Sequence, residues 1–105
     1  MNALAPIALF TYNRPLHTQR TLDALAANPE AKESILYIFS EGAKKDASVD
    51  VFEKIAAVRK IVNSEKRFKE VIVTEQSENL GLASSVIKGV TEILNKYEKI
   101  YSLAS

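Results

Sequence analysis

Residues 6–15, Pro6-Ile-Ala-Leu-Phe-Thr-Tyr-Asn-Arg-Pro15, join an apolar strand to a polar turn and the turn to a helix. Residues 7–10 are apolar without alternation, which is typical of a strand buried on both faces at the centre of a parallel sheet. Pro15 suits the first turn of a helix, and Asn13 is a candidate cap for it. Since open α/β sheets bind ligands just beyond the carboxyl ends of their strands, this polar turn is the first candidate site.

The same succession of apolar strand, polar loop and helix recurs along the chain. Further strands are expected at residues 35–39, 71–74 and 100–103. The first helix places Thr18, Leu22, Leu25 and Ala26 on one face. The second places Val51, Ile55, Val58 and Val62 inward and Glu53, Lys54, Arg59 and Lys60 in solvent. The third begins at Gly81 and points Ala83, Val86, Val90, Ile93 and Tyr97 inward.

This alternation predicts an α/β fold in which helices cover a parallel sheet. The expected architecture is a Rossmann-like three-layer sandwich with a mostly parallel four-stranded sheet of order 3-2-1-4, formed by a single domain over residues 1–105. Strand 1 then lies at the topological switch point, so its terminal loop is the favoured ligand site.

Composition excludes several classes of protein. The 105 residues carry 14 basic and 13 acidic side chains, so a net charge of +1 gives no reason to expect nucleic acid or an anionic membrane as partner. There is no cysteine for a disulfide or a thiolate metal site. No signal peptide or apolar span of roughly 20 residues is visible, so we expect a soluble cytoplasmic protein. The final residues begin a strand and stop without a turn, which predicts a chain truncated at its carboxyl end.

The strand-end loops also exclude familiar chemistries. The turn after the first strand has no glycine, so it is neither a dinucleotide fingerprint nor a P-loop. It has no carboxylate of the kind that holds Mg²⁺ in receiver-type phosphoacceptor sites. The single histidine, His17, lies at a helix start, where a solvated or capping role is favoured over a catalytic one.

What remains at the strand ends is a set of polar groups suited to a nucleotide. The candidate binding residues are Thr11, Tyr12, Asn13, Arg14, Glu41, Asn79 and Gly81. Tyr12 could pack on a base, Glu41 could accept an imide N–H, and Arg14 could bind a phosphate. Structural roles stay open for each: Asn13 as a helix cap, Arg14 as a solvated side chain, Glu41 as a turn residue, and residues 79–81 as the entry to a helix.

Three sequence blocks resemble one known family. Residues 6–15, residues Ile38-Phe-Ser-Glu-Gly-Ala-Lys44, and residues Glu78-Asn-Leu-Gly-Leu-Ala83 with Ile87-Lys-Gly-Val90 look like the nucleotide-binding half of a GT-A fold glycosyltransferase of the family 2 type. The resemblance covers essentially the whole chain. It implies that the loop after strand 1 holds the base of a nucleotide diphosphate sugar, and that Asn79 and Gly81 line the nucleoside side of the cleft.

The chain departs from this family at two positions. Glu41 stands where the family usually has Asp, and Ala104-Ser105 occupies the position of the acidic DxD-type motif, which binds a divalent cation, Mg or Mn, in the parent enzymes. The acceptor half is absent too, so no catalytic or metal-binding residue is assigned. We expect a donor-binding segment without turnover; the parent reaction transfers a glycosyl group to an acceptor hydroxyl.

Two alternatives stay open. One is a non-catalytic α/β interaction module that forms a homodimer through an exposed edge strand, made apolar by Ile100, Tyr101 and Leu103. The other is a different nucleotide binder of similar topology.

Overall fold

A computed structural model describes residues 6–79, 81–94 and 101–104 of the chain. The described elements, in chain order, are β1 (Ile7–Thr11), α1 (Pro15–Ala26), the 3-10 helix η1 (Pro29–Glu33), β2 (Ile35–Ser40), α2 (Val49–Asn63), β3 (Glu70–Glu75), α3 (Leu82–Leu94) and β4 (Tyr101–Ala104). The expected α/β class, with parallel strands joined by helices, is confirmed. None of the helices in these residues combines the length and the apolar character that crossing a bilayer requires.

The strands run parallel in the order β3-β2-β1-β4, so β1 and β2 lie inside the sheet. Thr11 is level with Ser40, and Ser40 with Glu75. The carboxyl ends of β1, β2 and β3 therefore reach the same edge of the sheet. This register aligns the loops that carry the candidate residues.

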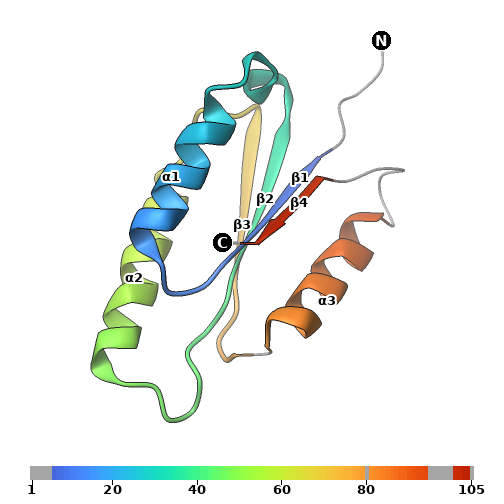
Figure 1. Cartoon of the computed structure of the whole chain (residues 1–105). Helices are drawn as coiled ribbons and strands as arrows, with labels where there is room; N and C mark the ends of the chain where they lie inside the picture. The colour runs from blue at the N-terminus through green and yellow to red at the C-terminus, as the bar shows by residue number, and fades with distance from the viewer. Residues whose placement is uncertain (1–5, 80, 95–100, 105) are drawn as a thin grey trace.

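Helices cover both faces of the sheet, with α1 and α2 on one side and α3 on the other (Figure 1). Leu9, Leu36 and Ile38 face the first side, where they pack with buried residues of α1 and α2. Ala8, Phe10 and Phe39 face α3 and form a second cluster with Ile93. Because successive strand residues point to opposite faces, β1 and β2 need apolar side chains at consecutive positions, which explains their lack of alternation.

Close packing of α3 depends on a glycine. The Phe10 and Phe39 rings stack with centroids 5.0 Å apart. A Cβ added at Gly89 would lie 2.9 Å from Phe10 Cε1 and 3.2 Å from Phe39 Cε2. Gly89 thus lets the α3 backbone approach the ring pair, whose burial stabilises the fold by about 1.5–3 kcal/mol per ring.

The expected apolar helix faces are largely confirmed. Thr18, Leu22, Ile55, Val58, Val62 and Ile93 are buried, and Leu25, Ala26, Val51, Val86 and Val90 are partly buried. The third helix begins at Leu82, one residue after Gly81. The expected positions of the side chains of Ala83, Tyr97, Ile100, Tyr101 and Leu103 lie outside what the structure describes.

Two local predictions are wrong. Asn13 does not cap α1: the N-cap position belongs to Arg14, and no side chain there makes a capping hydrogen bond. Pro15 at the first helical position removes one amide that a cap would otherwise serve. Arg59 of α2 does not extend into solvent; it is partly buried against the strand ends, because it lies at the border of the apolar stripe, four residues after Ile55.

Candidate functional site

Hydrogen bonds hold the chain together immediately past the ends of β1, β2 and β3. The Glu41 N–H donates to the Thr11 carbonyl at 2.9 Å, and the Gln76 N–H donates to the Ser40 carbonyl at 2.8 Å. Thr11 is buried, and its hydroxyl donates to the Phe39 carbonyl at 3.4 Å. The three loops thus leave the sheet side by side.

The loops after β2 and β3 are joined further out by Asn79. Its side-chain Nδ2 donates to the Gly42 carbonyl at 3.1 Å, while its Oδ1 accepts the Gly81 N–H at 2.9 Å. Gly81 has φ of +84°, a conformation that favours glycine. Asn79 therefore connects the loop after β2 to the entry of α3. Asn79 and Gly81 therefore form the entry to a helix, the structural role that the sequence left open for residues 79–81.

Gly42 allows these two loops to touch. A Cβ at this position would lie 2.7 Å from both the backbone N and the backbone C of Glu78, and 2.8 Å from the Gln76 carbonyl oxygen. These are main-chain atoms that cannot rotate aside. The close approach fixes the relative position of the loops that carry Glu41 and Asn79.

Glu41 lies at the junction of all three loops. It is buried, at 7% exposure, and its Oε1 accepts the N–H of Gly42 at 3.3 Å. This contact is local, between neighbouring residues, and the assigned turn of this loop lies further on, at residues 45–46. The Glu41 N–H bond to the Thr11 carbonyl holds the Glu41 main chain next to the end of β1.

The other three candidates follow Thr11 directly. Tyr12 and Asn13 are partly buried and Arg14 is exposed. The Arg14 carbonyl accepts the Thr18 N–H at 2.9 Å, which begins the hydrogen bonding of α1. Within the residues that the structure describes, no hydrogen bond or ion pair engages the side chain of any of the three. They lie at the strand-end edge with Glu41 and Asn79, but no side-chain hydrogen bond or ion pair among the described residues joins them to those two.

Arg59 is a residue of this region that sequence reasoning missed. From the middle of α2, its Nε donates to Ser40 Oγ at 3.1 Å and its NH2 group to the Gln76 carbonyl at 2.7 Å. The same NH2 group lies 3.4 Å from the Glu41 carbonyl. The available signal was its position beside the apolar stripe, where a long side chain can bury its stem and carry its charged end to nearby carbonyls.

The described residues offer no cluster suited to a divalent cation. No group of three His, Cys, Asp or Glu side chains lies together in residues 6–79, 81–94 and 101–104.

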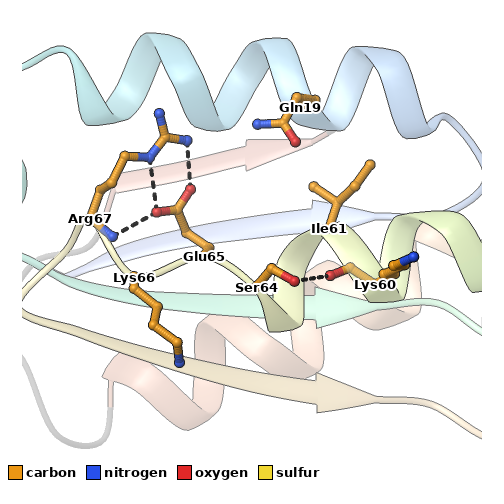
Figure 2. A pocket seen from close by; sticks show the side chains of 7 residues that line it. All are labelled: Gln19, Lys60, Ile61, Ser64, Glu65, Lys66 and Arg67. Carbon is orange, nitrogen blue, oxygen red and sulfur yellow. Dashed lines mark hydrogen bonds and ion pairs between the residues drawn. The ribbon is translucent and has the colours of Figure 1, made fainter.

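An open groove of about 480 Å³ lies elsewhere, between α1 and the end of α2 (Figure 2). Its lining residues are Gln19, Lys60, Ile61, Ser64, Glu65, Lys66 and Arg67. The Lys69 N–H donates to the carbonyl of Ser34, just before β2 begins. The Arg67 end of the groove is thus at the amino-terminal edge of the sheet, away from the candidate site.

The charged residues at this end of the groove bind one another. Arg67 contacts Glu65 at 2.7 Å and Asp23 of α1 at 3.0 Å. Burial of Glu65 acts to raise the pKa of its carboxyl group, but hydrogen bonds from Arg67 outweigh burial and the pKa lies below its usual value. Hydrogen bonds from Gln19 and Arg67 lower the pKa of Asp23. This cluster connects α1 to the turn before β3, which indicates a structural role.

Comparisons with protein-family models, with curated proteins and with solved structures found no match to this chain.

Proposed function

We propose that this chain binds a nucleotide diphosphate sugar at the carboxyl ends of β1, β2 and β3, as the donor-binding half of a GT-A type glycosyltransferase of the family 2 type. The observation that carries the proposal is the joining of the three strand-end loops by the Glu41, Gln76 and Asn79 hydrogen bonds. Loops that meet at one sheet edge can contact a single small ligand.

The side chains at this edge have complementary tasks. The partly buried ring of Tyr12 offers a face on which a base can stack. The Glu41 carboxylate is an acceptor for the N–H groups of a base edge. The exposed guanidinium of Arg14 is placed after the strand end, where it can bind a phosphate bidentately.

Binding is the whole of the proposed role. The parent reaction, transfer of a glycosyl group from the donor to an acceptor hydroxyl, needs an acceptor site and charge neutralisation at the departing diphosphate. None of the candidate residues is assigned either task, so donor turnover by the 105-residue chain would contradict this part of the proposal.

Calorimetric titration with uridine, guanosine and thymidine diphosphates tests the proposal. We expect one of them to bind, and the corresponding monophosphate to bind about tenfold more weakly, a difference of about 1.4 kcal/mol. Arg14→Met should remove this preference for the diphosphate. Arg20→Met, an exposed arginine of α1, is the matched control and should leave it unchanged.

Absence of binding by all three diphosphates would refute the proposal. Equal affinity for monophosphates and diphosphates would favour the alternative of a different nucleotide binder with a similar topology.

The interaction-module alternative also has an observation in its favour. β4 is at the end of the strand order and pairs only with β1 in the described sheet. Edge strands can pair with a second chain, which would give a homodimer. Sedimentation equilibrium over a wide range of protein concentration tests this alternative, and a monomer throughout would exclude it.

A further inference from the structure

We propose that Arg59 is a positioning residue of the strand-end site: its guanidinium sets the orientation of the loops after β2 and β3 that would receive the nucleotide. This inference rests on the proposed function. Arg59 belongs to neither loop. It reaches them from α2, which covers the opposite side of the strand ends from α3 (Figure 1).

Arg59 donates hydrogen bonds to the end of β2 and to both loops, and its NH1 group also lies 3.9 Å from the carboxylate of Glu75 at the end of β3. Nε donates to Ser40 Oγ, on the last residue of β2, at 3.1 Å. NH2 donates to the carbonyl of Gln76, just past β3, at 2.7 Å, and lies 3.4 Å from the carbonyl of Glu41, just past β2. One planar group thereby fixes the point at which each loop leaves the sheet.

Control of the Glu41 carbonyl extends into the site through the rigid peptide unit. The Glu41 carbonyl and the Gly42 N–H belong to one planar group. The Arg59 guanidinium contacts the carbonyl of this peptide unit. The Glu41 carboxylate accepts the N–H of Gly42, on the other side of the same unit, at 3.3 Å. The next carbonyl, that of Gly42, accepts Nδ2 of Asn79 at 3.1 Å. A rotated Glu41 peptide would therefore displace both the Glu41 carboxylate and Asn79.

The Gln76 carbonyl has the same function in the neighbouring loop. Its oxygen would be 2.8 Å from a Cβ at Gly42, so it lies against the loop after β2. The N–H of the same residue donates to the Ser40 carbonyl at 2.8 Å. Arg59 therefore holds Gln76, which contacts both β2 and Gly42.

Lysine cannot replace this arrangement. Guanidinium presents five N–H donors in a fixed plane, whereas an ammonium is a compact charge on a flexible stem. The acceptors of Arg59 are spread between Nε and NH2. Arg59→Lys keeps the positive charge and much of the aliphatic stem, but it cannot donate to Ser40 and Gln76 from two separate nitrogens. This variant therefore tests the donor geometry and not the charge.

The glycines provide built-in reporters, because the chain has only three. Gly42 and Gly81 lie in the two loops, and their N–H groups donate to Glu41 and Asn79. Gly89 lies on α3 against Phe10 and serves as the internal control. Amide hydrogen exchange of the three glycines, read by NMR on nitrogen-labelled protein, separates a local change in the loops from a general loss of stability.

The experiment compares the wild-type chain with Arg59→Lys, and with Lys60→Met as a charge control on the same helix. Exchange is measured without ligand, and affinity is measured for the diphosphate that the wild type binds. For Arg59→Lys we expect exchange at Gly42 to accelerate about tenfold, exchange at Gly89 to stay unchanged, and affinity to fall about tenfold. Lys60→Met should match the wild type in both measurements.

Each other outcome overturns the inference in a recognisable way. Unchanged affinity with accelerated Gly42 exchange would show that Arg59 orders the loops without positioning a ligand. Equal acceleration at all three glycines would show a role in overall stability alone. Wild-type protein that binds no diphosphate would refute the proposed function and this inference together, whereas wild-type binding with an unaffected Arg59→Lys variant would refute the inference alone.

Discussion

Gly42→Ala tests the contact between the loops after β2 and β3. The added methyl carbon would lie 2.7 Å from two backbone atoms of Glu78 and 2.8 Å from the carbonyl oxygen of Gln76. Ordinary contacts of this kind begin at 3.4 Å, so the loop after β3 must move away by about 0.6 to 0.7 Å. Main-chain atoms cannot make that shift by changing a rotamer.

Two costs follow from the shift. Overpacking of this kind costs about 1–3 kcal/mol. The displacement also weakens the Asn79 hydrogen bond to Gly42, which is worth about 1 kcal/mol. We therefore expect the free energy of unfolding to fall by about 2–4 kcal/mol, a large part of the 5–15 kcal/mol typical of a small domain. Urea denaturation followed by circular dichroism measures the change.

Gly81 is a useful comparison with Gly42, because backbone conformation and not lack of space favours glycine there. A Cβ there has no heavy atom within 4 Å, but φ is +84°. Gly81→Ala should cost about 1–2 kcal/mol, and Gly81→Asn should cost less because asparagine tolerates this region. At Gly42 the order reverses, since asparagine is larger than alanine. A Gly42→Ala change below about 0.5 kcal/mol, or the same order of variants at both positions, would refute the reasoning.

Two further predictions concern the rest of the fold. Gly89→Ala places a methyl carbon 2.9 Å from Phe10 Cε1, so the free energy of unfolding should fall by about 1–3 kcal/mol; an unchanged urea midpoint would contradict this. The pKa values of the Glu65 and Asp23 carboxyl groups are lowered in the folded chain, so both ionised groups stabilise the fold. This contribution is fully present above their ordinary pKa values of 4.5 and 3.8, and it is lost as the pH falls through the lowered values. Urea titrations from neutral to acid pH measure this loss, and Arg67→Met should reduce it; an identical pH profile for this variant would exclude the Arg67 contacts as its cause.

Much of the fold could be predicted because its signals are local. The unbroken apolar run of residues 7–10 predicts a strand buried on both faces, and Ala8, Leu9 and Phe10 are buried. The stripe containing Ile55, Val58 and Val62 predicts the inward face of α2, and all three are buried. The spacing of apolar residues along the chain differs between helices and strands, so these elements can be predicted without knowing which distant residues come into contact.

The site could be predicted only as a set of loops. Polar residues after each strand predict where the site lies, since parallel strands end at a common edge. The partners of Asn79 and Arg59 could not be predicted, because Gly42 is 37 residues from Asn79 and Gln76 is 17 from Arg59. The pairing of the buried Glu65 with the half-exposed Arg67 gave no sequence signal either, since charged residues near a helix end usually remain in solvent.

The order of residues alone specifies which segments become strands and helices, which faces are apolar, and that polar groups follow each strand, because these properties depend on neighbours a few positions apart. Folding adds what depends on distance in space. It makes Gly42 a point of contact, converts Arg59 from a surface charge into a donor to two loops, and gives Asn79 rather than Asn13 a capping-type contact, at the Gly81 N–H. The physical reason is that a backbone carbonyl removed from water needs a hydrogen-bond donor, and packing of the helices decides which side chain supplies it. Packing also decides where two backbones come so close that only glycine fits.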